Sequence, residues 1–357
     1  MKIGIVGLGL IGASLAKASS KAGHSVYGTD IDTQVVSQAI KEKIISSEMS
    51  IEELSNTCDI VVLCVPSRTA TTLVERALRG SAIVSDVSSV KSVICDEVSK
   101  LDRDLSDRFI GGHPMAGSEQ SGIDASRENM FESKMWILVP PEHNSLKHIE
   151  KLELFVSSIG AEHCILSPAQ HDKLVANISH LPQLASSALM DIAADKASDN
   201  EIILRLAGGG FRDMTRIAFN NKQMWMDIIQ DNGTEISKAL STYIENLSKI
   251  RDSIDSSDFN TVEDLFDRAR SARGSLPDAA RRLENLSEIL IPVPDIPGVL
   301  SKITALSSDL NVYDIKIVHA LEEDRGVLSL IVRPEDAELL ITRLVDNGFH
   351  AKRSDIS

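Results

Sequence analysis

The sequence predicts an α/β protein in three parts, beginning with a doubly wound parallel sheet. Short apolar runs alternate with helical stretches over residues 1–165, which is typical of a parallel sheet covered by helices on both faces. Residues 166–285 show helical periodicity without strand patterns, which predicts an all-helical domain. Residues 286–357 follow the order β-α-β-β-α-β, which predicts a small antiparallel sheet with both helices on one face.

Composition and charge limit the class of protein. Hydrophobic residues make up 43% of the 357 residues and charged residues 25%, an ordinary balance for a globular protein. The net charge of −15 argues against a surface for nucleic acid or for an anionic membrane. The four cysteines have no metal-ligand spacing, and we predict no metal site. No apolar run approaches the roughly 20 residues that span a bilayer, and the chain starts on a strand without a signal-peptide pattern. We therefore expect a cytoplasmic protein.

The first strand and helix enclose a glycine motif. Lys2–Val6 is an apolar strand, and Gly7-Leu-Gly9-Leu-Ile-Gly12 leads into a helical stretch. This pattern between strand and helix indicates a Rossmann-type dinucleotide site: Gly7 permits the turn, Gly9 lets a pyrophosphate approach, and Gly12 allows close helix packing. The helix N-terminus offers amides to the phosphates. Asp30 ends the second strand, where a carboxylate binds the ribose hydroxyls and repels a 2′-phosphate, so NAD is favoured over NADP.

Two later turns of the predicted sheet complete the cofactor site. Val65-Pro66 ends one strand and would turn the chain across the nicotinamide side of the crevice, and Asp86-Val-Ser88-Ser89-Val-Lys91 ends the next. We expect the cofactor to contact residues of all these turns: Gly7, Gly9, Leu10, Ile11, Gly12, Asp30, Val65, Pro66 and Ser88.

His113 is the candidate general base. It lies in Gly111–Glu119, directly after the apolar run Phe109-Ile110, and so at the carboxyl edge of the sheet, where ligands bind. A neutral imidazole there can accept a proton near pH 7, although a single histidine is more often structural. Ser89 lies on the same edge and would either hold the imidazole, bond a substrate hydroxyl, or cap the next helix. Lys91 adds an ammonium to this edge.

The middle segment, residues 166–285, is predicted to form long helices. His171–Ala194 is amphipathic, and Pro182 should kink it. Further helical runs are expected at Lys222–Ser253 and Thr261–Leu290. So many apolar faces are hard to bury within one subunit, so we expect a homodimer formed through these helices, the alternative being a self-contained bundle.

A glycine-rich turn with two arginines interrupts these helices. Gly208-Gly-Gly-Phe-Arg212-Asp-Met-Thr-Arg216 places the arginines four residues apart, on one face of any helix there. Guanidinium groups can bind a substrate carboxylate bidentately. Neutralisation in surface ion pairs is an equally good explanation of these two residues.

Several of these stretches together resemble the prephenate dehydrogenase family, in the family's order and over about residues 1–285. The motifs that carry the resemblance are Gly7-Leu-Gly-Leu-Ile-Gly12, Asp86-Val-Ser-Ser-Val-Lys91, Gly111-Gly-His-Pro-Met-Ala-Gly-Ser-Glu119, Ser179-His-Leu-Pro182 and Gly208-Gly-Gly-Phe-Arg-Asp-Met-Thr-Arg216.

The resemblance implies NAD-dependent oxidative decarboxylation of prephenate to 4-hydroxyphenylpyruvate, a step toward tyrosine. It implies that His113 takes the proton of the ring hydroxyl, that Ser89 orients this pair, and that Arg216 binds a substrate carboxylate. The other substrate-site residues that it implies are Arg212, Ser118, Glu119 and His180.

Gln183 departs from the family pattern, because several members have a histidine at the residue after His-Leu-Pro. A neutral amide can hydrogen-bond either a keto or an amino side chain. Prephenate is the first choice and arogenate the alternative. A catalytically silent amino-acid sensor on the same fold is an alternative of another class, and a hydroxyacid dehydrogenase is disfavoured because no motif supplies its lysine base.

The last domain resembles ACT domains at Pro294-Asp295-Ile-Pro297-Gly298-Val299-Leu300. The resemblance implies an amino-acid effector, expected to be tyrosine, bound by residues of this turn: Asp295, Gly298, Val299 and Leu300. A dimerising appendage without a ligand is the alternative.

Overall fold

The computed structural model describes residues 1–117, 120–141, 145–199, 202–276, 286–294, 296–319 and 325–354. Contacts divide the chain into two compact units, Met1–Asn246 and Leu247–Ser357. The two units are described separately below. No helix within the described ranges combines the length and apolar character that crossing a membrane requires.

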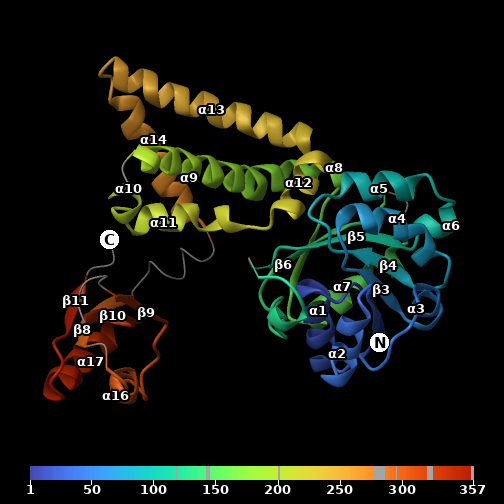
Figure 1. The fold of residues 1–357 in the computed structure, drawn as a ribbon, viewed down its shortest axis with the longest axis horizontal. Coiled ribbons are helices and arrows are strands. Elements are labelled where there is room, and N and C mark those ends of the chain that lie inside the picture. The colour runs from blue at the N-terminus through green and yellow to red at the C-terminus, as the bar shows by residue number, and fades with distance from the viewer. Residues whose placement is uncertain are drawn as a thin grey trace. The chain divides into compact units, whose positions relative to one another are not determined.

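The first unit contains a seven-stranded sheet in the order β2-β1-β3-β4-β5-β6-β7 (Figure 1). Its strands are β1 (Lys2–Val6), β2 (Ser25–Thr29), β3 (Ile60–Leu63), β4 (Ile83–Asp86), β5 (Phe109–Pro114), β6 (Met135–Val139) and β7 (Glu162–Ile165). β1 to β5 run parallel, as the sequence predicts.

The expectation of a wholly parallel sheet is wrong at β6, which pairs antiparallel with β5, while β7 runs parallel to β6. A parallel neighbour needs a crossover, usually a helix, over one face of the sheet. The chain between β5 and β6 instead forms the short 3₁₀ turn η1 (Ile123–Ala125) and buries Ile123 and Phe131 in the core beside α1 (Leu10–Lys21). It then returns along β5 in the opposite direction.

Both faces of this sheet are covered, because alternate residues of each strand enter different cores. Ile60 and Val62 of β3 belong to the core that includes residues of α1, α2 (Thr33–Lys41) and α7 (Leu146–Ser158). Val61 and Leu63 enter the core with α3 (Ile51–Thr57), α4 (Ser67–Leu78) and α5 (Ser92–Ser99). Full burial of such side chains contributes about 1.5–3 kcal/mol each. α6 (Arg103–Ser106) precedes β5.

The helical segment begins at a capping box on Ser167 and Gln170. A π-helical turn directly precedes the α-helix that contains Pro182, so the helix type changes next to the residue at which a kink is predicted, and proline has no N–H to donate to the preceding turn. The elements are α8 (Pro168–Val175), the π turn η2 (Ala176–His180), α9 (Leu181–Asp199), α10 (Ile202–Arg205), α11 (Gly209–Thr215), the 3₁₀ turn η3 (Arg216–Phe219), α12 (Lys222–Asp231), α13 (Gly233–Asp255) and α14 (Asn260–Gly274).

Two helix predictions in this segment are partly wrong. The run Lys222–Ser253 breaks at Asn232, whose side chain is buried in contacts with α8 and η2. The run Thr261–Leu290 is helical only to Gly274 within the described residues, and residues from Ser287 onward form a strand.

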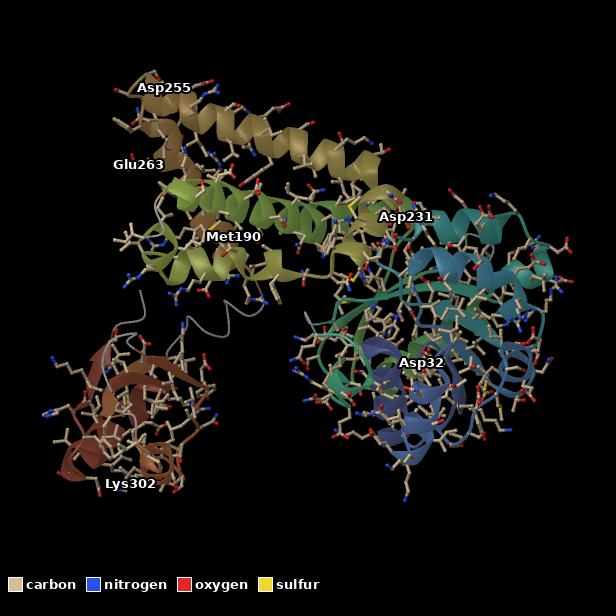
Figure 2. The ribbon with its side chains drawn as sticks, viewed as in Figure 1. Asp32, Met190, Asp231, Asp255, Glu263 and Lys302 are labelled. Atoms are coloured by element: carbon tan, nitrogen blue, oxygen red, sulfur yellow. The ribbon has the colours of Figure 1, made fainter. Side chains whose placement is uncertain are left out.

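The second unit contains the predicted four-stranded antiparallel sheet, in the order β11-β8-β10-β9. Its elements are β8 (Ser287–Pro294), α16 (Val299–Leu306), β9 (Asp314–His319), β10 (Arg325–Val332), α17 (Pro334–Asp346) and β11 (Lys352–Ser354). Ile303 of α16 and Leu340 of α17 share one core with Ile291 and Leu330 of the sheet, so both helices cover the same face. Lys302 of α16 is labelled in Figure 2.

Candidate active site

The glycine turn between β1 and α1 is built for close packing at two positions and for access at the third. Gly7 has φ +92°, and a Cβ there would lie 2.5 Å from the carbonyl oxygen of Cys64. A Cβ on Gly12 would lie 1.9 Å from the carbonyl oxygen of Gly7. A Cβ on Gly9 would meet no atom within 4 Å. Gly7 and Gly12 therefore hold strand against helix, and Gly9 leaves the turn open to a ligand.

The start of α1 fits a dinucleotide phosphate. The helix begins at Leu10, and Gly9 provides no side-chain cap, so the amides of Leu10, Ile11 and Gly12 have no partner within the helix. These amides and the positive end of the helix dipole form an anion site beside the open face of Gly9.

Asp30 follows β2 and faces the same turn. Its Oδ2 accepts a hydrogen bond from the Leu8 amide at 2.6 Å, and its Oδ1 accepts one from the Asp32 amide at 2.9 Å. Each oxygen keeps a further lone pair, so the carboxylate can still accept bonds from ribose hydroxyls. Val65 is half-buried after β3, and Pro66 is exposed at the start of α4.

The loop after β4 is fixed by a buried ion pair between Lys91 and Asp86. Lys91 Nζ donates to Asp86 Oδ2 and, at 2.8 Å, to the carbonyl oxygen of Gly112. Gly112 in turn donates its amide to Asp86 Oδ1 at 3.1 Å, and a Cβ on Gly112 would lie 2.5 Å from the Asp86 carbonyl oxygen. The Lys91 ammonium therefore lies at this edge, as predicted, and is engaged by Asp86 and the Gly112 carbonyl oxygen. Ser88 Oγ is buried without a partner among the described residues.

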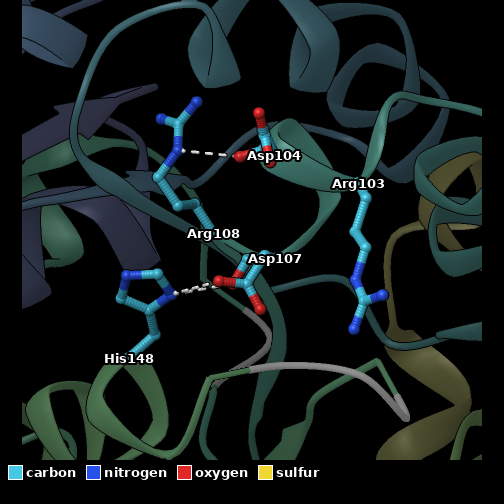
Figure 3. A pocket seen from close by; sticks show the side chains of 5 residues that line it. All are labelled: Arg103, Asp104, Asp107, Arg108 and His148. Carbon is cyan, nitrogen blue, oxygen red and sulfur yellow. Dashed lines mark hydrogen bonds and ion pairs between the residues drawn. The ribbon is translucent and has the colours of Figure 1, made fainter.

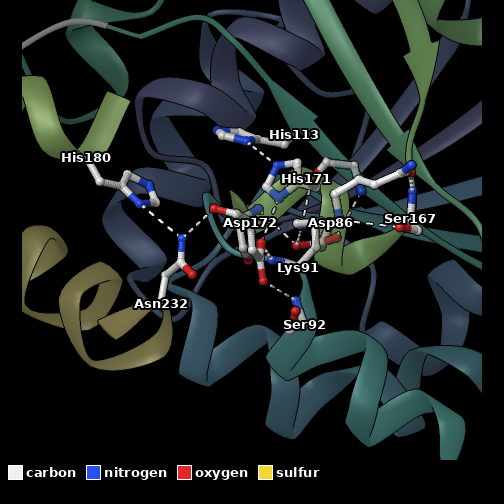
Figure 4. A network of polar contacts seen from close by, with 12 residues as sticks. Asp86, Lys91, Ser92, His113, Ser167, His171, Asp172, His180 and Asn232 are labelled. Carbon is white, nitrogen blue, oxygen red and sulfur yellow. Dashed lines mark hydrogen bonds and ion pairs between the residues drawn. The ribbon is translucent and has the colours of Figure 1, made fainter. Parts of the chain in front are cut away.

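His113 lies near the end of β5 and belongs to a chain of polar contacts that the sequence analysis missed (Figure 4). Its Nδ1 lies 2.8 Å from Nε2 of His171, and Nδ1 of His171 lies 2.7 Å from Oδ1 of Asp172. Asp172 accepts the backbone amides of Lys91 at 2.8 Å and Ser92 at 2.9 Å, at the start of α5.

The charge states in this chain follow from burial and hydrogen bonding. Burial lowers the pKa of His113 well below its ordinary value, and His171, Lys91 and His180 lower it further, whereas Asp172 raises it. Burial alone would raise the pKa of Asp172, but hydrogen bonds from His171, Ser92 and Lys91 lower it. At neutral pH His113 is thus a neutral imidazole and Asp172 a carboxylate.

Ser89 plays neither of two expected roles in the structure. It is half-buried in the loop between β4 and α5 and makes no hydrogen bond to His113 among the described contacts; His171 holds that ring instead. It does not cap the next helix either, since α5 begins at Ser92 and Asp172 accepts the amide at its start. Its remaining expected role, bonding a substrate hydroxyl, is a prediction.

His180 and Gln183 form a buried polar stripe across η2 and α9, together with Ser186. Asn232 Nδ2 lies 3.3 Å from Nδ1 of His180 and donates at 2.9 Å to the carbonyl oxygen of Asp172. Because an amide nitrogen can only donate, Nδ1 of a neutral His180 accepts and its Nε2 carries the proton. That Nε2–H is buried and has no partner among the described residues. Burial lowers the pKa of His180 to about 4.

Gln183 forms a hydrogen bond with Asn220, a residue that the sequence analysis did not single out. Its Oε1 accepts from Nδ2 of Asn220 at 2.7 Å, and its Nε2 lies 3.4 Å from Oγ of Ser187. Asn220 follows η3, which packs on α9. Trp225 of α12 contacts the His180 ring edge-on at 5.8 Å between centroids.

Arg212 and Arg216 are exposed on α11 and at the start of η3, four residues apart as predicted. Neither guanidinium group forms an ion pair with another described residue. The described structure therefore does not support the alternative that surface ion pairs neutralise these two arginines. Ser118 and Glu119 lie outside the described residues.

The end of α12 joins the stripe to the cofactor side of the sheet. Ser67 Oγ, at the start of α4, donates to Asp231 Oδ2 at 2.8 Å, and Arg68 donates to Gln230. Asp231 is labelled in Figure 2. The helix that contacts His180 through Trp225 therefore also contacts the turn after β3.

A hollow of about 440 Å³ lies beside the amino end of β5, away from His113 (Figure 3). Its lining residues are Arg103, Asp104, Asp107, Arg108 and His148. Arg108 donates to the carbonyl oxygens of Leu78 and Gly80, and His148 Nδ1 donates to the Asp107 carbonyl oxygen at 2.8 Å. These polar groups are used in holding loops together.

In the C-terminal unit, Gly298 has φ +88° and precedes α16, whose first residues are Val299 and Leu300. A Cβ on Gly298 would meet no atom within 4 Å. Asp295, the fourth expected effector residue, lies outside the described residues.

Comparison with known proteins identifies the family. The nucleotide-binding domain of prephenate dehydrogenase matches residues 15–165, and the dimerization domain of prephenate dehydrogenase matches residues 167–268. The chain is 31% identical to a prephenate dehydrogenase of Lactococcus lactis over 94% of its length and 95% of the relative's. The protein belongs to the prephenate dehydrogenase family. It is an oxidoreductase with the mixed α/β architecture described above.

Other members of this family are similar over much of the chain. A Bacillus subtilis prephenate dehydrogenase is 30% identical over 93% of this chain and 92% of its own length. The A. aeolicus prephenate dehydrogenase, solved with hydroxyphenyl propionate and NAD+, is 29% identical with a TM-score of 0.70 and covers 76% of this chain and 97% of its own. Synechocystis arogenate dehydrogenase is 30% identical with a TM-score of 0.65, over 76% of this chain and 99% of its own.

Proposed function

We propose that the protein catalyses the NAD-dependent oxidative decarboxylation of prephenate to 4-hydroxyphenylpyruvate, a step in tyrosine biosynthesis. The observation that carries this proposal is the buried, neutral His113 at the carboxyl edge of the sheet, with Nδ1 engaged by His171 at 2.8 Å and Nε2 as its remaining ring nitrogen. A base at this edge faces the crevice where dinucleotides bind in such folds.

The residues of the first glycine turn would hold NAD. The phosphates would lie at the amides of Leu10 and Ile11 beside Gly9, and the adenosine ribose would bond to Asp30. Val65, Pro66 and Ser88 border the nicotinamide side, and the unpartnered Ser88 hydroxyl supplies a hydrogen bond there. When bound, NAD accepts the hydride from the ring carbon that carries the substrate hydroxyl.

His113 takes the proton of that hydroxyl on Nε2 as the carbon becomes a carbonyl. The ring carboxylate then leaves as carbon dioxide, and its bonding electrons complete the aromatic ring. The carbonyl oxygen becomes the phenol oxygen and regains a proton from His113, so the base is restored. Ser89 bonds the hydroxyl during this transfer.

Substrate carboxylates would bind to the cations of the helical segment and to the polar stripe. Arg216 binds one carboxylate, and Arg212 assists on the same side of the chain. The Nε2–H of His180 is a buried donor that lacks a partner among the described residues, as a ligand-binding group would before the ligand arrives. The family resemblance adds Ser118 and Glu119, which lie outside the described residues, to the proposed substrate site.

Gln183 favours the keto side chain of prephenate over the amino side chain of arogenate. Its side-chain carbonyl oxygen already accepts a hydrogen bond from Asn220, and a neutral amide carries no negative charge. The ammonium group of arogenate would therefore be buried here without a carboxylate to pair with. Arogenate dehydrogenase is the alternative, and the similarity to the Synechocystis enzyme of that name supports it.

The test measures NADH formation by the purified protein with prephenate and with arogenate, and compares kcat/KM for the two. We expect prephenate to be preferred. A higher value with arogenate would establish the alternative, and retained ligand binding without turnover of either would indicate a silent sensor.

We further propose that tyrosine inhibits the enzyme through the C-terminal unit, an ACT-like domain with Gly298, Val299, Leu300 and Asp295 at the effector site. The left-handed Gly298 and the open space around it would let the start of α16 receive an amino-acid carboxylate. Gly298→Asp should abolish inhibition by tyrosine through charge repulsion, whereas the isosteric and neutral Gly298→Asn, which tolerates the left-handed backbone, should retain it. Equal inhibition of both variants would place the effector elsewhere.

The protein is proposed to be a homodimer through its helical segment. Large apolar side chains stay exposed there in the single chain: Ile178, Ile192, Leu206, Met214 and Phe219. The matching family model is described as a dimerization domain. Sedimentation of Phe219→Asp should show a shift toward monomer, and an unchanged mass would exclude this surface.

A further inference from the structure

We propose that His171 and Asp172 are positioning residues for proton transfer at His113: they fix the tautomer that leaves Nε2 free and offset the positive charge that the ring acquires. The inference deepens the proposed function and rests on it for its chemistry. Its structural part, the orientation of the His113 ring, can be tested without a substrate.

The three side chains form one buried line from the substrate edge into the protein. His113 comes from β5, and His171 and Asp172 come from α8, so the line crosses from the nucleotide-binding sheet to the helical segment. His113 is 8% exposed, His171 0% and Asp172 3%. Water therefore does not compete with their hydrogen bonds, and each ring is held in one orientation.

The direction of every hydrogen bond follows from the far end of this line. Both Asp172 oxygens accept backbone amides at the start of α5, so the carboxylate is fixed as an acceptor. Nδ1 of His171 must then donate to it, and Nε2 of a neutral His171 must accept. Nδ1 of His113 consequently carries a proton, and its Nε2 is an unprotonated base.

The reverse arrangement gives no base. If Nδ1 of His113 accepted from Nε2 of His171, a neutral His171 would turn a lone pair toward the Asp172 carboxylate at 2.7 Å, which is repulsive. A doubly protonated His171 would avoid this repulsion but would leave the proton of a neutral His113 on Nε2. Neither arrangement could accept the substrate proton.

Asp172 also offsets the positive charge that develops on His113, whereas the other neighbours of His113 oppose that charge. The groups that face His113 are Lys91 from the loop after β4, His171 and Asp172 from α8, and His180 from η2, and of these Asp172 is the one that raises the pKa of His113. The Lys91 ammonium is already paired with Asp86. The Asp172 carboxylate, itself stabilised by the amides of α5, therefore stabilises the imidazolium that forms when His113 takes the proton.

The first test is spectroscopic and uses the full-length protein with ¹⁵N-labelled histidine at neutral pH. His113 should show the pattern of a neutral ring protonated on Nδ1, with its signals identified by their loss in His113→Asn. A His113 protonated on Nε2, or a doubly protonated His171, would overturn the proposal. This result does not depend on which substrate is used, so it separates a failure here from a failure of the proposed function.

The second test is kinetic. His171→Gln keeps Asp172 and its bonds to α5 but removes the link between the carboxylate and His113. It should lower kcat by roughly 10- to 100-fold with unchanged KM values, because the orientation and tautomer of His113 are lost whereas the groups that bind substrate and cofactor are kept.

His148→Gln is the matched control, since His148 also contacts an aspartate, Asp107, but at the other end of β5. It should leave kcat and its pH profile unchanged. If His171→Gln changes only thermal stability or KM, the residues are merely structural and the proposal fails. If His171→Gln does not fold, the His113 tautomer in the unmodified protein decides the question.

Discussion

The two ends of β5 offer similar side chains and differ in what surrounds them. At the carboxyl end, His113 reaches Asp172 through His171, and all three residues are almost fully buried. At the amino end, His148 lies 3.3 Å from Asp107, with the two side chains 23% and 28% exposed. The amino end also borders the hollow of about 440 Å³ (Figure 3).

The candidate site is distinguished by the burial of its side chains and by their hydrogen bonds to one another. The types of residue and the volume of a neighbouring hollow do not distinguish it. Partly exposed pairs exchange hydrogen bonds with water and are screened, so they contribute little to energy or orientation. A buried network with a partner for each polar group fixes its members and strengthens their electrostatic effects. Burial and close packing should therefore decide how strongly each substitution acts, from the largest expected effect to the smallest.

Gly12→Ala should cost about 4 kcal/mol or more in the free energy of unfolding, because the new Cβ would overlap the Gly7 carbonyl group at 1.9 Å. Gly9→Ala is the control at the same edge: its Cβ meets no atom within 4 Å, so stability should be kept while KM for NAD rises. Urea unfolding and initial rates measure the two effects. Unchanged NAD affinity in Gly9→Ala would remove the carboxyl edge as the cofactor site.

His113→Asn should lower kcat by about 10²-fold or more, the scale of a lost general base, which corresponds to roughly 2.7 kcal/mol. The asparagine amide can still donate to His171, so the network should persist and NAD affinity should change little. His148→Asn, at the amino end, should retain full activity. The contrast between the two ends is lost if both variants behave alike in steady-state kinetics.

Acidification should destabilise the protein through its buried histidines. The pKa of His180 falls from 6.5 to about 4 on folding, so the unfolded state binds more protons, and stability is lost as pH drops below about 6.5. For this group the loss is about 2 kcal/mol at pH 5. His180→Gln, which keeps an acceptor for Asn232, should show a smaller drop in thermal unfolding temperature between pH 7 and 5. An equal drop would mean that His180 is not buried as a neutral ring.

Arg216→Ala should raise KM for the substrate about tenfold, or roughly 1.4 kcal/mol, through loss of a bound carboxylate. KM for NAD should stay the same, which serves as the internal control. A change confined to NAD would assign the arginine to the cofactor and would remove the helical segment from the substrate site.

The nucleotide-binding half was predictable where the signal is local. Gly7 and Gly12 lie within one strand–turn–helix unit and Asp30 follows the next strand, and the close packing of the turn admits only glycine at the first two positions. The position of His113 at the edge of the sheet was predictable for the same reason, since its strand and the preceding glycines are adjacent in sequence. The β5–β6 reversal was not, because the direction of a strand depends on how its connection packs.

His171 and Asp172 escaped prediction because their role depends on packing between α8 and the β4–α5 loop. Leu174 and Ile178 are exposed, and the buried residues of α8 are His171, Asp172 and Val175. Two adjacent polar residues in a predicted helix are usually expected to face solvent. Asn220 was missed similarly, as it acts through Gln183.

The π turn at Ala176–His180 sets the relative rotation of two groups of functional side chains. It accommodates one more residue than an α-helical turn, between the helix that carries His171 and Asp172 and the helix that carries Gln183. Each residue of an α-helix advances about 100° around its axis. A single insertion here would therefore rotate Gln183 relative to His171 by more than a quarter of a revolution, whereas a single deletion would leave an ordinary α-helical turn and keep the two groups in register.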